Sequence, residues 1–223
     1  MLLSASILAA NISQLGADVS NMDAAGADWI HLDCFDGHFV PTLTFGPAIV
    51  QAVRGYTQRP LDIHFMAERP WQYFPALAEV QKITPHNLRV TVHVEACTQV
   101  AEVIATLRQH KIAVGLALLE ATPASAVLPY LADIDQVLVM TVRGGYGGDP
   151  FLPHVLPKIA ELRTAINALP PAKQPLLAVD GGISLTTAPL VAQAGANVLC
   201  AGSALFKGHN WAENVVNLRA AAQ

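Results

Sequence analysis

The stretch Ala25-Gly-Ala-Asp-Trp-Ile-His-Leu-Asp33 contains the helix-to-strand transition from which the fold can be predicted. Gly26 stands where the end of a helix favours a residue that tolerates the left-handed backbone conformation. The short apolar run that follows is typical of a strand, and it ends on the polar residue Asp33. The segment Ala194-Gly-Ala-Asn197 repeats the same helix stop before another apolar run. Both segments predict a helix that leads directly into a buried strand.

The same alternation extends along the chain, with about 25 to 30 residues for each strand and helix. Eight strands are expected, at Leu2–Leu8, Trp29–Asp33, Leu61–Met66, Arg89–His93, Ala113–Leu119, Gln136–Thr141, Leu176–Asp180 and Val198–Gly202. Helix starts are expected at Asn11–Ser13, at Thr122–Pro123 for the fifth helix, and at Ser184–Thr186. Most strand runs are continuously apolar, which is typical of a parallel sheet covered on both faces. We therefore predict an α/β fold, a single (β/α)8 TIM barrel that forms one domain over residues 1–223.

The composition favours an enclosed sheet and a small ligand. Only 13% of the 223 residues are charged, against about 25% in an average soluble domain, so helices should cover the sheet on all sides. The shortage of charge also points to an apolar interface in a homo-oligomer. A net charge of −4 without a basic run argues against nucleic acid or an anionic membrane as the main partner.

The compartment can be predicted from the N-terminus and the cysteines. The first residues, MLLSASILAANIS, lack a charged segment before the apolar run and favour a strand over a signal peptide. The longest apolar run, Ile112–Leu119, is far shorter than the roughly 18 residues that a membrane helix needs. Cys34, Cys97 and Cys200 form no CxxC pair, so reduced and mostly buried thiols are expected. We predict a soluble, cytoplasmic protein.

Polar residues stand at or just beyond several predicted strand ends, and in such a barrel these ends converge on one functional face. They are His31 with Asp33, His64, His93 with Glu95, and Asp180. His31 and Asp33 are two residues apart, so their side chains point to the same side of the strand. Together with His64 and Asp180 they form a ligand set suited to Zn, Mn, Fe or Co. We expect one divalent metal ion there, and we interpret His93 as a hydrogen-bonded core residue. An alternative for Asp180 is a turn-capping role before Gly-Gly.

Three glycine-containing segments follow consecutive predicted strands, at Gly144–Gly148, Asp180–Gly182 and Ala201–Ser203. Glycine lets backbone N–H groups approach an anion closely, and barrels of this kind often bind phosphate in the loops after their last two strands. A sugar phosphate is therefore the expected ligand.

On these residues the chain resembles the ribulose-phosphate 3-epimerase family, from Ser4 to Phe206. WIHLDCFDGHFVP at Trp29–Pro41 and LDIHFM at Leu61–Met66 correspond to two family signatures, and Val179–Ile183 and Ala201–Ser203 correspond to its phosphate end. The resemblance implies a barrel of the ribulose-phosphate-binding type and an isomerase of carbohydrate metabolism in the pentose phosphate pathway. The implied reaction interconverts D-ribulose 5-phosphate and D-xylulose 5-phosphate through an enediolate.

The resemblance also implies roles for individual residues. Asp33 would accept the C3 proton and Asp180 would donate one to the opposite face, which fits the two acid/base groups that inversion requires. The metal, held by His31, Asp33, His64 and Asp180, would act as a Lewis acid on the substrate oxygens. The implied substrate contacts are Ser4, His64, Gly145, Tyr146, Gly147, Gly148, Asp180, Gly181, Gly182, Gly202 and Ser203.

Departures from the family pattern cluster around the expected pocket, which Phe35, Met66, Met140 and Arg143 are predicted to line. Phe35 replaces a methionine, Ser4-Ala5-Ser6 replaces Ser-Pro-Ser, and Leu119-Glu120 and Arg143-Gly144 each replace Asn-Pro. We hypothesise that Arg143 adds positive charge to the phosphate or sugar end of the pocket.

Three alternatives remain open. The first is a 3-epimerase of another ketose phosphate, such as D-allulose 6-phosphate. The second is a decarboxylase or aldolase on the same barrel, which lacks support because no lysine ends a predicted strand and Asp33-Cys34-Phe35 lacks the Asp-x-Lys pair of related decarboxylases. The third is a non-catalytic sugar-phosphate-binding homologue.

Overall fold

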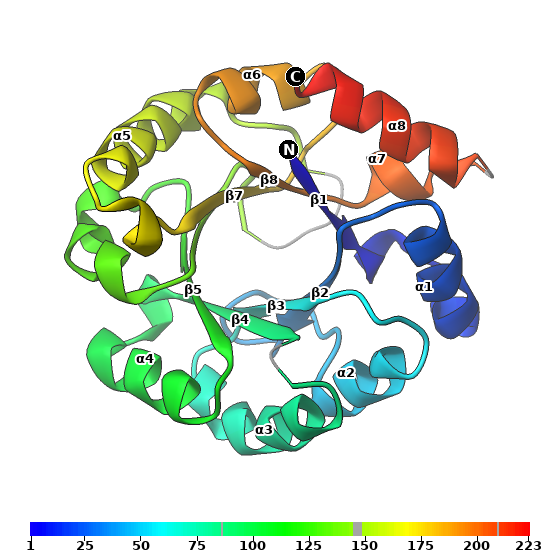
Figure 1. The fold of residues 1–223 in the computed structure, drawn as a ribbon, viewed down its shortest axis with the longest axis horizontal. Helices are drawn as coiled ribbons and strands as arrows, with labels where there is room; N and C mark the ends of the chain where they lie inside the picture. The colour runs from blue at the N-terminus through cyan, green and yellow to red at the C-terminus, as the bar shows by residue number, and fades with distance from the viewer. Residues whose placement is uncertain (86, 145–148, 209) are drawn as a thin grey trace.

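A computed structural model describes residues 1–85, 87–144, 149–208 and 210–223. Eight parallel strands pair in chain order, and β8 closes onto β1 (Figure 1). The strands are Leu2–Ser6 (β1), Trp29–Phe35 (β2), Leu61–Met66 (β3), Leu88–His93 (β4), Ala113–Leu118 (β5), Gln136–Met140 (β6), Leu176–Asp180 (β7) and Val198–Ala201 (β8). The predicted (β/α)8 TIM barrel is confirmed.

The helices surround the strands, as Figure 1 shows. They are Leu15–Ala24 (α1), Pro47–Arg54 (α2), Phe74–Ile83 (α3), Val100–Gln109 (α4), Leu156–Asn167 (α5), Ala188–Gln193 (α6), Ser203–Phe206 (α7) and Trp211–Ala221 (α8). The prediction of an α-helix that begins at Thr122–Pro123 is wrong. The chain after β5 instead forms two 3-10 helices, Ala124–Ala126 and Leu128–Asp133. Pro123 and Pro129 lie six residues apart in this segment, and a proline inside an α-helix removes a hydrogen bond and clashes with the preceding turn.

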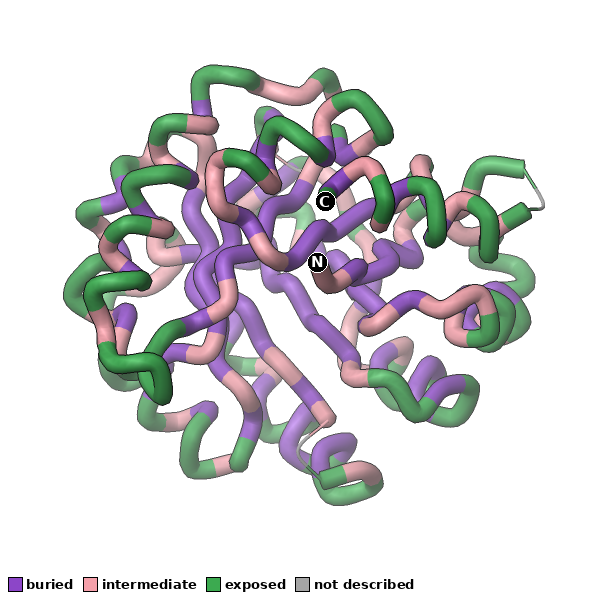
Figure 2. The backbone as a smooth tube through the Cα atoms, turned by 45° about the horizontal axis from the view of Figure 1, so that its top comes forward, coloured by how far each residue is buried: buried purple, intermediate pink, exposed green. Residues whose placement is uncertain are grey.

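Burial explains why the strand segments are continuously apolar. Every residue of β2, β3 and β6 is buried, because helices cover the outer face and side chains fill the lumen. Figure 2 shows the buried strands at the centre and exposed residues along the outer surfaces of the helices. Each fully buried aliphatic side chain contributes about 1.5–3 kcal/mol to folding. This enclosed core accounts for the low charge content of the chain.

The observed strand ends lie close to the predicted ones. β3 and β7 have the predicted bounds, whereas β2 extends to Phe35 and β1 stops at Ser6. Gly26 has a φ of +96°, so the expected left-handed helix stop before β2 is confirmed. Among the helices of the described residues, none combines the length and the apolarity that crossing a bilayer requires.

Strand register sets the depth of each polar side chain in the lumen. The β2–β3 ladder pairs His31 with Asp62 and Asp33 with His64. On the other side of β1 and β8 in the closed barrel, β7 ends on Asp180, which pairs with Met140 of β6 and Cys200 of β8. Several polar residues therefore meet near the C-terminal ends of the strands, where barrels carry their active sites.

Candidate metal centre and substrate pocket

Four side chains from β2, β3 and β7 converge at the C-terminal end of the lumen. One potential ligand atom from each of His31, Asp33, His64 and Asp180 lies within 4.8 Å of all the others, and all four residues are buried. His31 presents Nε2 to Asp33 Oδ1 at 3.2 Å and to Asp180 Oδ2 at 3.7 Å. His64 presents Nδ1 to the same two oxygens, at 3.4 Å and 3.3 Å respectively.

The donor set fits a divalent metal ion. Within the described part of the chain, Nδ1 of His64 has no hydrogen-bond partner although it is fully buried. A buried nitrogen without a partner is costly, and a metal ion between it and the carboxylates would satisfy it. Two imidazole nitrogens and two carboxylate oxygens are ligands that Zn, Mn, Fe and Co share.

The electrostatics of the cluster also favour a cation. Burial raises the pKa of the Asp33 carboxyl, but His31 and His64 outweigh this effect and hold the pKa far below its usual range. Burial and the neighbouring Asp33 raise the pKa of Asp180, yet its contacts with His31 and His64 leave it below its usual range. Burial lowers the pKa of His64, while the Asp180 and Asp33 carboxylates raise it above its usual value. Two ionised carboxylates thus stabilise positive charge between them.

The rear nitrogens of both histidines are hydrogen-bonded. His31 Nδ1 contacts Asp62 Oδ2 at 2.8 Å, and the same oxygen accepts a hydrogen bond from the Ser4 hydroxyl at 2.9 Å. His64 Nε2 contacts Nε2 of His93 at 2.9 Å, which agrees with the interpretation of His93 as a hydrogen-bonded core residue. Asp62 was not identified from the sequence, although it precedes His64 by two residues and so shares its face of the strand.

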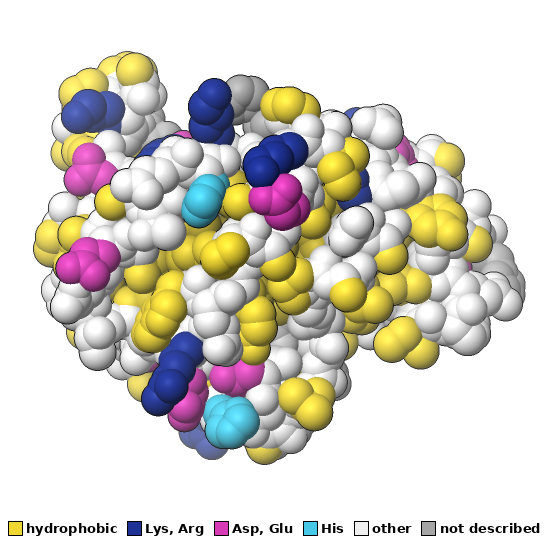
Figure 3. All heavy atoms as spheres, turned by 90° about the horizontal axis from the view of Figure 1, so that it is seen from below, with side chains coloured by type: hydrophobic (Ala, Val, Ile, Leu, Met, Phe, Trp, Pro, Cys, Tyr) yellow, Lys and Arg dark blue, Asp and Glu magenta, His cyan; other side chains and the backbone are white. Residues whose placement is uncertain are grey.

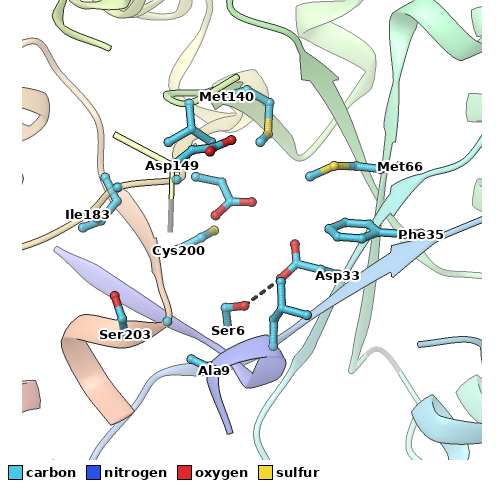
Figure 4. Close-up of a pocket in the computed structure, with 16 residues that line it drawn as sticks. Ser6, Ala9, Asp33, Phe35, Met66, Met140, Asp149, Ile183, Cys200 and Ser203 are labelled. Atoms are coloured by element: carbon cyan, nitrogen blue, oxygen red, sulfur yellow. Dashed lines mark hydrogen bonds between the residues drawn. The ribbon is translucent and has the colours of Figure 1, made fainter. Parts of the chain in front are cut away.

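A cavity of ≈ 350 Å³ opens above the two carboxylates (Figure 4). Asp33, Asp180, Phe35, Met66 and Met140 line it, which places the three predicted apolar residues beside the acid/base pair. The cavity continues to the loops after β7 and β8, where its lining residues are Gly181, Gly182, Ile183, Gly202 and Ser203.

Gly181 has a structural reason to be glycine. Its φ is +106°, and a Cβ atom there would lie 2.4 Å from Cγ2 of Val142. The loop after β7 therefore packs directly on the chain that leaves β6, and the Thr141 hydroxyl shares its single proton between the carbonyls of Asp180 and Gly181. This packing forms one wall of the cavity.

Ser4 requires a correction. It is fully buried and its hydroxyl donates to Asp62, so it lies below the cavity instead of contacting a substrate. Ser6 lines the cavity and donates to Asp33 Oδ2 at 2.6 Å, as the dashed line in Figure 4 shows. The two serines are two residues apart and share a face of β1, and the register explains the difference because Ser6, not Ser4, pairs with His31.

His64 and Arg143 were also expected at the pocket. His64 is fully buried beside the carboxylates and is not among the residues that line the cavity, so its contact with substrate stays a prediction. Arg143 is exposed, and the cavity wall formed by the described residues contains Val142 in its place. The predicted contacts Gly145, Tyr146, Gly147 and Gly148 lie outside the described residues.

Several lining residues were missed at the sequence level. They are Ser6, Leu8, Ala9, Val142, Asp149, Ile183 and Cys200. Of these, Ser6 could have been found from its place two residues after Ser4, whereas Asp149 follows the glycine-rich segment 144–148, whose sequence has no periodicity.

A family model and the sequences of known proteins match this chain to the same family. The Ribulose-phosphate 3 epimerase family model matches residues 2–206. The ribulose-phosphate 3-epimerase of Bacillus subtilis is 42% identical over 201 residues, with 90% of each chain covered. That of Synechocystis is 38% identical over 96% of this chain and 91% of the relative. The barrel is also similar to 3-hexulose-6-phosphate synthase from Salmonella typhimurium, with a TM-score of 0.63, 16% identity, and coverage of 100% and 98%.

Proposed function

Because the chain belongs to the ribulose-phosphate 3-epimerase family, we propose that Asp33 and Asp180 carry its reaction at a metal site completed by His31 and His64. The protein is an isomerase that interconverts D-ribulose 5-phosphate and D-xylulose 5-phosphate. One observation carries the proposal. The buried carboxylates of Asp33 and Asp180 lie together at the floor of the cavity, beside a His64 Nδ1 that makes no hydrogen bond within the described residues.

The two aspartates are suited to move protons on opposite faces of the substrate. Inversion at C3 requires one group that removes the proton and another that returns a proton from the other side. Asp33 comes from β2 and Asp180 from β7, with β1 and β8 between these strands, so they approach a molecule in the cavity from different directions. When D-ribulose 5-phosphate is the substrate, Asp33 acts as the acceptor and Asp180 as the donor, and Asp180 must take up a proton from solvent before it can donate one.

The residues around the reacting carbons would stabilise the negative charge that develops on the substrate oxygens. A divalent ion of the Zn, Fe, Mn or Co type would supply a Lewis acid for the carbonyl and hydroxyl oxygens of the substrate. Ser6 holds the orientation of the Asp33 carboxylate through its hydrogen bond to Oδ2. Phe35, Met66 and Met140 exclude water around the reacting carbons, which strengthens each electrostatic contact.

The phosphate group is proposed to lie between the loops after β7 and β8. Gly181, Gly182, Gly202 and Ser203 line this end of the cavity, and glycine backbone allows N–H groups to approach the phosphate oxygens. This is the position at which barrels of this architecture frequently bind phosphate.

The oligomeric state and compartment are proposed as well. Large hydrophobic side chains such as Tyr56, Trp71 and Ile83 are exposed, and Figure 3 shows hydrophobic side chains interspersed with charged ones on one face. We expect these to support a homo-oligomer, which light scattering would test. Cys34, Cys97 and Cys200 are free thiols, and this supports the cytoplasm as the compartment.

The decisive experiment follows the C3 proton. Metal-loaded protein incubated with D-ribulose 5-phosphate in deuterated water is expected to yield D-xylulose 5-phosphate that carries deuterium at C3. Asp33→Asn is expected to lose both bound metal, measured by elemental analysis, and turnover, because one side chain serves both roles. Full turnover by Asp33→Asn, or an absence of C3 exchange in the loaded wild-type protein, would overturn the proposal.

A further inference from the structure

We propose that His93 and Glu95 are positioning residues which fix the tautomer and ring orientation of His64, and thereby set the affinity of the site for a divalent metal ion. This inference rests on the proposed metal site and adds to it two residues outside the ligand set. Neither residue contributes a ligand atom to the cluster of four.

The three side chains form a continuous hydrogen-bonded chain that leads away from the site. His64 Nε2 lies 2.9 Å from His93 Nε2, and His93 Nδ1 lies 3.2 Å from Glu95 Oε2. The two imidazole rings are stacked, with centroids 5.1 Å apart and an interplanar angle of 24°. Both histidines are fully buried, so water does not compete for the contact between them.

Metal binding determines where the protons of this chain must lie. A metal ion at His64 Nδ1 requires that nitrogen to be deprotonated, so the ring proton of neutral His64 is on Nε2. That proton can only be donated to His93 Nε2, which must then be an acceptor. Neutral His93 therefore carries its proton on Nδ1 and donates it to the Glu95 carboxylate. One arrangement of protons satisfies every member of the chain.

The far end of the chain is fixed by the loop after β5. Glu95 Oε1 accepts a hydrogen bond from the Leu119 backbone N–H at 2.8 Å. Lys158 in turn donates to the carbonyls of Leu119 and Glu120, each at 2.8 Å. The loop after β5 thus holds the Glu95 carboxylate in place at the end of the hydrogen-bonded chain.

The other ligating histidine is held in a different manner. His31 contacts the Asp62 carboxylate directly through Nδ1 and presents Nε2 to the site. His64 presents Nδ1 and reaches its carboxylate through an intervening imidazole. The two ligands are thus held in opposite tautomers by partners of the kind that orient metal-bound histidines.

The test compares two replacements of His93 that differ in the acceptor they offer. His93→Phe keeps a buried ring but removes the acceptor, whereas His93→Gln keeps an amide oxygen that can accept from His64. The dissociation constant for Co²⁺ is measured by competition with a chelator, together with the visible absorption spectrum of the Co²⁺ protein. We expect His93→Phe to bind Co²⁺ about 10- to 100-fold more weakly, with an altered spectrum, and His93→Gln to bind close to wild type. His154→Gln at an exposed position is the matched control.

The melting temperature of each metal-free variant separates positioning from a merely structural role. A purely structural role would lower the melting temperature of the metal-free His93→Phe protein and leave the Co²⁺ constant unchanged, and that result would overturn the inference. If His93→Phe does not fold, Glu95→Ala at the partly exposed end of the chain replaces it, with a loss of about tenfold or more expected. If wild type fails to bind Co²⁺, the proposed metal site fails and this inference with it. If wild type binds and no variant weakens binding, only the inference fails.

Discussion

Asp33 of β2 and His64 of β3 are register partners in the parallel ladder, with His64 Nδ1 3.4 Å from Asp33 Oδ1. Two positions earlier the same ladder pairs His31 with Asp62, whose side chains are also in contact. Because side chains at i and i+2 share a face, one register places three of the four proposed ligands, and Asp62 that contacts His31, in the lumen. A slip of one residue would turn these side chains toward the helices, so the site is a direct product of β2–β3 pairing.

Alanine variants of Ser4 and Ser6 test which of the two β1 serines reaches the cavity. Ser6→Ala removes the hydrogen bond to Asp33, so we expect kcat/KM to fall by about tenfold or more. Ser4→Ala removes one donor to the buried Asp62 carboxylate, which keeps its contact with His31, so we expect the free energy of unfolding to fall by ~1–3 kcal/mol. Urea unfolding and steady-state kinetics measure the two effects. A Ser4→Ala protein that loses activity as strongly as Ser6→Ala without losing stability would show that the assignment is wrong.

Gly181→Ala tests the packing of the proposed phosphate loop. The new Cβ would lie 2.4 Å from Val142 Cγ2 at a φ of +106°, so we expect a loss of at least ~1 kcal/mol in unfolding free energy. We also expect a higher KM for D-ribulose 5-phosphate, because the loop must move. Gly46→Ala is the control, since a Cβ there meets no atom within 4 Å, and its change should stay below about 1 kcal/mol. Equal effects in both variants would contradict this explanation.

The strands, and the places of the four clustered residues at strand ends, could be predicted because they depend on local patterns. Continuous apolar runs identified all eight strands, and the spacing of His31 and Asp33 placed both on one face. The depth of Ser4 and Ser6 could not be predicted, because period-two alternation gives the face and only the register with β2 gives the height. The contact of His93 with His64 depends likewise on the β3–β4 register, in which His64 pairs with Thr91.

The free thiols give a prediction with a definite pH dependence. Burial and the nearby Glu95 carboxylate raise the pKa of Cys97 from its ordinary value of 9.0 to about 11. A raised pKa keeps the thiol protonated, so alkylation by iodoacetamide at pH 8 should be about 100-fold slower than for a free thiol. The rate should rise about tenfold per pH unit up to pH 10 while the protein stays folded. Mass spectrometry of single labels measures this rate, and labelling at the rate of free cysteine would contradict the prediction.

Arg143→Ala tests the corrected position of that side chain. The residue is exposed, and Val142 occupies the cavity wall beside it. We therefore expect KM for D-ribulose 5-phosphate to stay within about twofold of wild type at physiological salt, because an exposed charge beyond contact distance is largely screened. A rise of tenfold or more would instead support the hypothesis that Arg143 contributes charge to the pocket.

Phe35 is the departure from the family pattern that the structure places directly in the cavity, next to Asp33 on β2 and in register with Met66. An aromatic ring is more rigid than a methionine side chain, which adapts to irregular spaces. The ring therefore limits the space beside the reacting carbons, and we expect wild type to prefer D-ribulose 5-phosphate to the six-carbon D-allulose 6-phosphate. Phe35→Met should narrow this preference, measured as the ratio of the two kcat/KM values. A pocket contact that accommodates one extra carbon is worth about 1–3 kcal/mol, so a shift of about 10-fold or more in the ratio is expected. A wild-type preference for the six-carbon substrate, or an unchanged ratio in Phe35→Met, would contradict this explanation.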